Sequence, residues 1–204
     1  MDTILGIRGP TFVMLAADTT QARSIMVMKQ DENKIHKISN NLMIATVGDS
    51  GDAVQFTEFI SKNIALYKMR NGYDLSPKCA AHFTRKNLAD YLRSSSPYKV
   101  NMLVAGFDPK ESLPELHYID YLANAKSVKY GGQGYGGMFC ASIFDRYYYD
   151  KITQAEAYEV LKKCVAEIHK RLIINLPKFH VAVVDDQGVH NLEPITAKNL
   201  EQLQ

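Results

Sequence analysis

The chain has 204 residues, of which 46% are hydrophobic and 23% are charged, and its formal net charge is +2. This length accommodates one domain with a sizeable core and is too short for two comfortable ones. The small net charge, the lack of basic clusters interleaved with aromatic residues and the lack of an apolar run of roughly 18–20 residues argue against a nucleic-acid-binding or membrane-spanning protein.

The first part of the chain predicts short strands separated by turns. Gly9-Pro10 and Ser39-Asn40-Asn41 are turn sequences between apolar runs. A further short strand is expected before Lys34. The remaining strands expected in this part span residues 3–8, 11–17, 35–38 and 42–47.

Two helices are expected next. Apolar residues recur at spacings of three and four between residues 51 and 70, and Asn71-Gly72 is a typical helix end. Ser76-Pro77 is an N-cap followed by a first-turn proline, so a second helix begins there and runs toward the breaker at 94–97.

The second half repeats the order of strands and then helices. Strands are expected at 100–107, 116–122 and 127–130, a glycine-rich loop at 131–137, a helix at 138–149, a helix from Thr153 to about 174, and a hairpin at 180–185 and 189–192. Thr153 and Glu156 have the spacing of a capping box. Two sheets between two helical layers, a four-layer αββα sandwich of the α+β class, would bury this pattern, although the pattern alone does not specify that fold.

The motif with the clearest chemistry lies at the start of the chain. Ala16-Ala17-Asp18-Thr19 ends the second expected strand, and Lys34 follows. This order resembles the N-terminal nucleophile hydrolases, and more closely the proteasome β subunits, whose chains open with Thr-Thr-x-(apolar), then Ala-Ala-Asp-(Ser/Thr), then Lys. The same alignment puts Asp2 at the position of the nucleophile. The resemblance implies the αββα fold of the proteasome subunit with its catalytic hydroxyl missing.

The residue at this position decides whether the chain is an enzyme. In the resembled family a threonine hydroxyl is activated by its own α-amino group, which titrates near pH 8. The carboxylate of Asp2 offers no hydroxyl. Removal of two residues would expose Thr3, but adjacent side chains of a strand point to opposite faces, so Thr3 would face away from Lys34 and Asp18. We therefore expect a non-catalytic chain.

The resemblance assigns Asp18, Lys34 and Gly48 to the remnant of a catalytic site. In active relatives the lysine favours the alkoxide, the aspartate pairs with it, and the glycine N–H helps to form an oxyanion hole. Alternatively, Asp18 and Lys34 form a buried ion pair that persists because the loss of one charge leaves the other uncompensated, and Gly48 is a turn glycine. Without a nucleophile the ion-pair interpretation is favoured, with Asp2 as a further partner of Lys34.

Three more positions depart from the family pattern. Tyr135 stands in place of a serine in the glycine-rich segment, and Leu172 and Asn175 replace the aspartate and serine of an Arg-Asp-x-x-Ser segment. These departures agree with the loss at Asp2. The glycine-rich segment also lacks the Gly-Lys-Ser/Thr ending of a phosphate-binding loop.

No metal site or cofactor is expected. The three cysteines, Cys79, Cys140 and Cys164, are odd in number and widely spaced, and no pair of histidines has metal-ligand spacing. With no Asn-x-Ser/Thr site and no signal peptide, this pattern favours a reducing, intracellular setting.

A cluster of aromatic residues is a candidate interface. Arg146, Tyr147, Tyr148 and Tyr149 are adjacent, and Tyr and Arg are enriched at interface hot spots. The alternative, that the rings are divided between core and surface, stays open.

The resemblance extends from residue 2 to about 193 and is strongest to the β type-2 group, at the β4 ring position. It predicts a proteasome β-subunit domain at 1–193 and a C-terminal tail at 194–204. It implies a structural subunit of the 20S core in cytoplasm and nucleus, within a 28-subunit hetero-oligomer of other β subunits and α subunits that serves ubiquitin-dependent and other proteasomal degradation. An active threonine hydrolase and a free-standing module are the alternatives.

Overall fold

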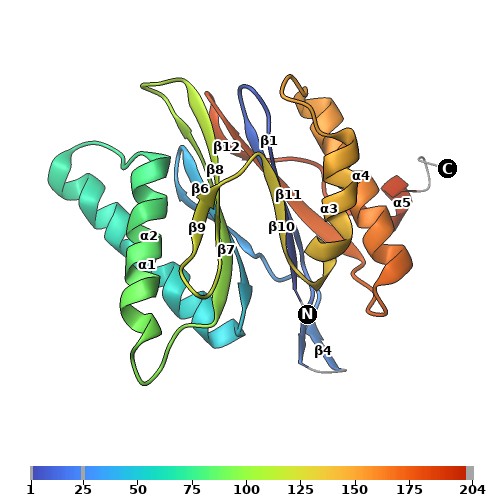
Figure 1. Cartoon of the computed structure of the whole chain (residues 1–204), viewed down its shortest axis with the longest axis horizontal. Coiled ribbons are helices and arrows are strands. Elements are labelled where there is room, and N and C mark those ends of the chain that lie inside the picture. Colours follow the sequence, from blue (N-terminus) through green and yellow to red (C-terminus); the bar gives the residue numbers. More distant parts are fainter. Residues whose placement is uncertain (1, 24–25, 201–204) are drawn as a thin grey trace.

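A computed structural model describes residues 2–23 and 26–200. Two β-sheets lie face to face, and a pair of helices covers the outer face of each (Figure 1). The predicted four-layer αββα sandwich is confirmed.

The first sheet contains the start of the chain. β1 (Thr3–Arg8) lies between β2 (Val13–Asp18) and β10 (Tyr130–Gly134), and the order across the sheet is β10-β1-β2-β11-β12. β11 spans Lys178–Asp185 and β12 spans Gly188–Asn191. A short strand, β13 (Ile195–Thr196), also pairs with β11, so part of the predicted C-terminal tail joins this sheet. The last four residues of that tail lie outside the described residues.

The second sheet has the order β5-β6-β7-β8-β9. Its strands are β5 (Ile35–Ser39), β6 (Leu42–Gly48), β7 (Val100–Asp108), β8 (Leu113–Ile119) and β9 (Ala125–Ser127). β7 is buried over most of its length, which its continuous apolar sequence predicts. Between β2 and β5 in the chain, β3 (Gln21–Arg23) and β4 (Met26–Lys29) form a separate two-stranded ribbon.

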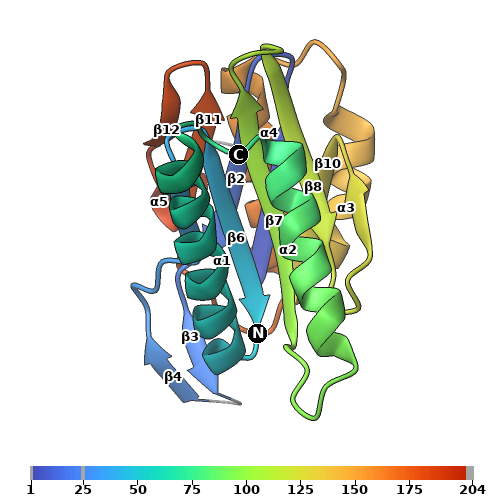
Figure 2. The same ribbon diagram turned by 90° about the vertical axis from the view of Figure 1, so that its left-hand side faces the viewer.

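The predicted capping residues mark the end of α1 and the starts of α2 and α4. α1 (Ser50–Asn71) ends at Gly72, whose φ is 78°, and Ser76 caps α2 (Pro77–Leu92). Figure 2 shows α1 and α2 running along the outer face of the second sheet. α3 (Tyr135–Tyr147) and α4 (Gln154–Arg171) cover the first sheet, and Thr153 and Glu156 form the expected capping box. A short α5 (Ala197–Leu200) follows β13.

The apolar core is divided among the three spaces between the layers. Ile4, Leu15 and Leu103 belong to the cluster that separates the two sheets. The other two clusters lie between each sheet and its pair of helices. No helix among the described residues is long and apolar enough to cross a membrane.

The glycine-rich segment differs from the expected loop. Its first half is strand β10, and α3 begins at Tyr135, three residues before the expected position. A Cβ at Gly132 would lie 2.8 Å from the Cα of Gly137, so the glycines permit a close approach of β10 to α3. A Cβ at Gly134 would lie 1.9 Å from the carbonyl oxygen of Asp2, and its φ is 80°. The glycines therefore serve packing around the start of β1.

Smaller differences concern the ends of elements. The strand expected at 116–122 is β8 and ends at Ile119, and the strand expected at 127–130 is replaced by β9 and β10. The helix expected to reach 149 ends at Tyr147, and the helix expected to reach 174 ends at Arg171. Apolar side chains beyond these ends still contact the core, which explains why periodicity alone extended the elements.

A buried amide joins the two sheets. Gln133, on β10 of the first sheet, donates from Nε2 to the carbonyl oxygens of Met102 (2.8 Å) and Ile119 (2.9 Å) on the second sheet. The side chain is 4% exposed. These hydrogen bonds join the two sheets beside the apolar cluster that lies between them.

We predict that Gln133→Leu lowers the free energy of unfolding by about 1–3 kcal/mol, because two buried carbonyl oxygens lose a donor. Chemical denaturation of the isolated chain at low concentration measures this loss. Gln187→Leu, an exchange at an exposed turn position, is the matched control, with an expected change within about 0.5 kcal/mol. Equal losses in the two variants would contradict the bridging role.

Candidate functional site

Three elements bring the charged residues of the N-terminal motif together. Asp2 immediately precedes β1, Asp18 is the last residue of β2, and Lys34 immediately precedes β5 of the other sheet. The antiparallel register of β1 and β2 pairs Ile4 with Ala17, which places the start of one strand beside the end of the other. The site therefore lies where an end of the first sheet meets the second.

Lys34 is the centre of a polar network. Its Nζ donates to Asp2 Oδ1 at 2.7 Å, to Asp18 Oδ2 at 2.8 Å and to the carbonyl oxygen of Thr20 at 2.8 Å. The Lys34 side chain is only 8% exposed. All three ammonium donors thus have acceptors, and the expected pair of Asp2 and Lys34 is observed as a direct contact.

Asp18 is fully buried and is held by the backbone as well as by Lys34. The amide of Thr3 donates to Oδ1 at 2.7 Å and the amide of Thr20 donates to Oδ2 at 3.0 Å. Burial raises the pKa of Asp18, and the charge and hydrogen bond of Lys34 oppose that rise. The carboxylate therefore fastens the beginning of β1 to the end of β2.

Thr3 faces away from this network. Its side chain is fully buried, and its Oγ1 accepts a hydrogen bond from the amide of Gly136 at 3.2 Å, at the start of α3. Asp2, the preceding residue, contacts Lys34 instead. This arrangement agrees with the alternation of adjacent strand side chains.

Gly48 has a conformation that other residues rarely adopt. Its φ is 149°, and a Cβ would lie 2.1 Å from the carbonyl oxygen of Lys99. This backbone geometry alone accounts for a glycine there. An oxyanion-hole role for its N–H stays a prediction.

A cavity of about 700 Å³ opens beside Asp2, Lys34 and Gly48. Its lining combines charged, polar and apolar side chains from the ribbon, the second sheet and the start of α1: Asp2, Gln21, Ala22, Met28, Glu32, Asn33, Lys34, His36, Thr46, Val47, Gly48, Asp49, Ser50, Gly51, Ala53 and Val54. Burial lowers the pKa of His36. Within the described part of the chain, no group of three or more His, Cys, Asp or Glu side chains is placed to hold a metal ion.

The other departures from the family pattern occupy three different environments. Tyr135 is the first residue of α3 and is 60% exposed. Leu172 caps α4 and packs against the core, while Asn175 is exposed in the segment that follows. Leu172 provides no carboxylate and Tyr135 no serine hydroxyl at these positions.

The candidate interface residues are divided between core and surface. The Tyr148 ring packs on the Tyr130 ring, with centroids 4.9 Å apart, and contacts the core. Arg146, Tyr147 and Tyr149 are exposed. An interface role for this cluster stays a prediction.

Sequence reasoning missed the backbone partners of the network. The amide of Thr3 and the carbonyl oxygen of Thr20 complete the contacts of Asp18 and Lys34. Because nearly every residue has the same backbone groups, residue type could not predict which of them would contact Asp18 and Lys34.

We predict that Lys34→Met lowers the free energy of unfolding by about 3–5 kcal/mol near pH 7, because Asp18 is left as an uncompensated buried charge. The loss should be smaller near pH 5. Without its cation, the buried carboxyl has a pKa above its unfolded value, so proton uptake favours the folded state as the pH falls. Denaturant titrations at the two pH values measure this difference.

Lys29→Met is the control for that substitution. Lys29 forms an ion pair with Glu32 at 3.1 Å, but its side chain is 48% exposed. We expect a change of about 0–1 kcal/mol with little dependence on pH. A comparable loss in both variants would show that the buried network has no special role in stability.

Comparison with known proteins agrees with this geometry. The family described as "Proteasome subunit" matches residues 1–184. Similar curated proteins include "Proteasome subunit beta type-2-B" of Arabidopsis thaliana, with 44% identity covering 92% of this chain and 94% of the relative. "Probable proteasome subunit beta type-4" of Schizosaccharomyces pombe is 40% identical over 94% of this chain and 99% of its own length.

The "Proteasome subunit beta type-4" of Saccharomyces cerevisiae is 38% identical, over 97% of this chain and 100% of its own length. The resemblance inferred from Ala16-Ala17-Asp18-Thr19 and Lys34 is thus confirmed across nearly the whole sequence. The chain belongs to the proteasome subunit family.

Proposed function

We propose that this chain is a non-catalytic, structural β subunit of the 20S proteasome core, at the β4 position of the ring. In this role it completes the wall of the chamber in which active subunits cleave proteins, for ubiquitin-dependent and other proteasomal degradation. It works in the cytoplasm and nucleus, within a 28-subunit hetero-oligomer of other β subunits and α subunits.

The contact between Asp2 and Lys34 carries the proposal. A carboxylate occupies the position that the family pattern gives to threonine, and it lies 2.7 Å from the lysine that would favour an alkoxide. The ammonium is thereby committed to two carboxylates and one carbonyl oxygen. A carboxylate at this position cannot be activated as a hydroxyl nucleophile.

The environment of Thr3 argues against the active alternative. Its amide and its hydroxyl oxygen are both engaged, with Asp18 and with the start of α3 respectively. Exposure of Thr3 as a new N-terminus would leave its side chain fully buried in this packing. Substrate access to that hydroxyl would require β1 and α3 to separate.

We predict that a threonine-directed covalent inhibitor, applied to purified core particles that contain this chain, leaves the chain unmodified. The expected adducts are on the active subunits of the same particle, which serve as an internal control. Intact mass and N-terminal sequencing provide the measurement. An adduct on Thr3 would overturn the non-catalytic assignment.

A second prediction concerns assembly. A tagged copy of the chain should co-purify with a cylinder of about 28 subunits. At micromolar concentration the isolated chain should aggregate or bind chaperones, since empty ring contacts expose apolar surface. Native mass spectrometry and sedimentation measure both. A stable, monodisperse monomer at micromolar concentration that never enters a larger particle would contradict the structural role.

A further inference from the structure

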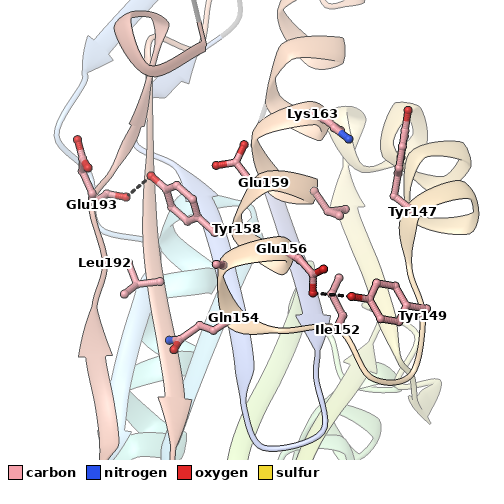
Figure 3. A pocket seen from close by; sticks show the side chains of 12 residues that line it. Tyr147, Tyr149, Ile152, Gln154, Glu156, Tyr158, Glu159, Lys163, Leu192 and Glu193 are labelled. Carbon is pink, nitrogen blue, oxygen red and sulfur yellow. Dashed lines mark hydrogen bonds between the residues drawn. The ribbon is translucent and has the colours of Figure 1, made fainter. Parts of the chain in front are cut away.

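A basic cavity lies between α3 and α4. Its volume is about 460 Å³, within the range of sites that accommodate small molecules. The lining residues come from the two helices: Ser142, Ile143, Arg146, Tyr147, Lys163, Ala166, Glu167 and Lys170. A neighbouring cavity of about 680 Å³, drawn in Figure 3, shares Tyr147 and Lys163 with it. None of the residues that line the basic cavity belongs to the Lys34 network.

Helical spacing brings the polar side chains of the basic cavity together. Ser142 and Arg146 are four residues apart on α3, so they lie on one face of that helix. Lys163, Glu167 and Lys170 follow one another at spacings of four and three on α4, so they also share a face. The two faces meet in the cavity.

Three of these side chains are cations without an acidic partner. Within residues 2–23 and 26–200, no carboxylate forms an ion pair with Arg146, Lys163 or Lys170. Like charges that share a cavity repel one another, and an anion placed between them relieves that repulsion.

The carboxylates at neighbouring positions of α4 are already engaged. Glu167 pairs with the Nε of Arg171, and Glu159 pairs with Lys162 at 2.7 Å. Figure 3 shows Glu159 and Lys163 on successive turns of α4, with the Lys163 side chain directed away from Glu159. These two ion pairs leave the three cations of the cavity uncompensated.

An aromatic ring holds two of the cations beside the cavity. The Lys163 ammonium lies 3.8 Å from the centre of the Tyr147 ring, and the Arg146 guanidinium lies 5.4 Å from it. Cation–π attraction positions these side chains but does not neutralise their charges. Part of the binding site is therefore arranged before a ligand enters.

Helix electrostatics explain only part of this arrangement. Arg146 and Lys170 lie in the last turns of α3 and α4, where a cation is favourable beside unpaired carbonyl groups. Lys163 lies in the middle of α4, so the same explanation does not apply to it. Binding of an anion accounts for all three positions.

We propose that the basic cavity binds a small polyphosphate anion. A phosphate group carries nearly two negative charges and several acceptor oxygens, so two or three such groups neutralise three cations within a small volume. The guanidinium of Arg146 offers paired N–H donors to one phosphate group, and the ammonium groups of Lys163 and Lys170 contact the others. Ser142 adds a hydroxyl donor.

An acidic protein segment and a nucleotide are less suitable ligands. Each carboxylate supplies one charge, so three acidic side chains would have to enter one cavity of about 460 Å³. A nucleotide base would need a free aromatic face for stacking, whereas two cations already lie over the Tyr147 ring. The experiment distinguishes both from a simple polyphosphate.

Lysine footprinting in core particles that contain this chain tests the proposal. The particles are acetylated with an amine-reactive ester, with and without inositol hexakisphosphate as the probe, and the peptides are quantified by mass spectrometry. At a probe concentration about ten times its dissociation constant, the labelling rates of Lys163 and Lys170 should fall about tenfold, because free sites become that much rarer. Lys151, which is exposed and outside the cavity, is the internal control and should keep its rate.

Four results would overturn the proposal. The first is an equal labelling rate with and without the probe. The second is a lack of labelling of Lys163 and Lys170 before the probe is added, because a protein segment would then cover the cavity. The third is equal protection by sulfate at the same ionic strength, which would indicate charge screening alone. The fourth is stronger protection by ATP, which would indicate a nucleotide site.

Charge removal supplies the second arm. Arg146→Gln should raise the dissociation constant of the probe, measured at Lys163, about tenfold, equivalent to roughly 1.4 kcal/mol. Arg93→Gln is the matched control, because Arg93 is exposed at the end of α2 and outside the cavity, and its constant should match that of the parent. Lys170→Gln should also weaken binding and replaces the first variant if that one does not enter particles. Equal constants in all variants would contradict the assigned roles.

This inference depends on the proposed function only for the form in which the chain is tested. If the parent chain enters particles on native gels but the probe protects neither lysine, only the polyphosphate site is wrong. If the parent chain never enters a particle, the proposed function is wrong, and the same labelling of the isolated chain at nanomolar concentration decides the fate of the basic cavity.

Discussion

The ammonium of Lys34 is a buried charge, and the residues around β1 and β2 supply the acceptors that compensate it. Two carboxylates and one backbone oxygen surround it within 2.8 Å. One of those carboxylates, Asp18, also accepts the first amide of β1. Because β1 lies between β2 and β10, the same interaction fixes the strand about which the first sheet is built. The network that resembles a catalytic pattern therefore also holds β1 and β2 together.

Under the proposed non-catalytic function, this double use gives Asp18 and Lys34 a structural reason to be present. Removal of either Asp18 or Lys34 would leave a buried charge without its partner, which is costly whatever the chemistry of the site. Tyr135, Leu172 and Asn175 have no comparable network: Tyr135 and Asn175 are exposed and Leu172 packs apolar surface.

The order of strands and helices followed from periodicity and turn residues, whereas the four layers and the Lys34 network were expected from the resemblance to the proteasome β subunits. Capping residues such as Ser76 and Thr153 defined helix starts correctly. The glycine-rich segment was misjudged because glycine is typical of loops, whereas here Gly132 and Gly137 allow a strand and a helix to approach closely. The cavity lined by Tyr147, Ile152 and Leu192 was not foreseen, because these residues come from three parts of the chain that only the fold brings together.

The hydrogen bonds of Gln133 affect how the two sheets are positioned relative to each other. Contact between apolar surfaces has little directional preference. Two sheets held by such contact alone could therefore shift relative to each other at little cost in free energy. A directional pair of hydrogen bonds to Met102 and Ile119 selects one of those positions. In a closed ring with a fixed number of members, small angular errors in each wedge add up around the circle. In the ring proposed above, the Gln133 amide and the Lys34 network together hold the two sheets of this subunit in one relative position, which keeps its angle constant.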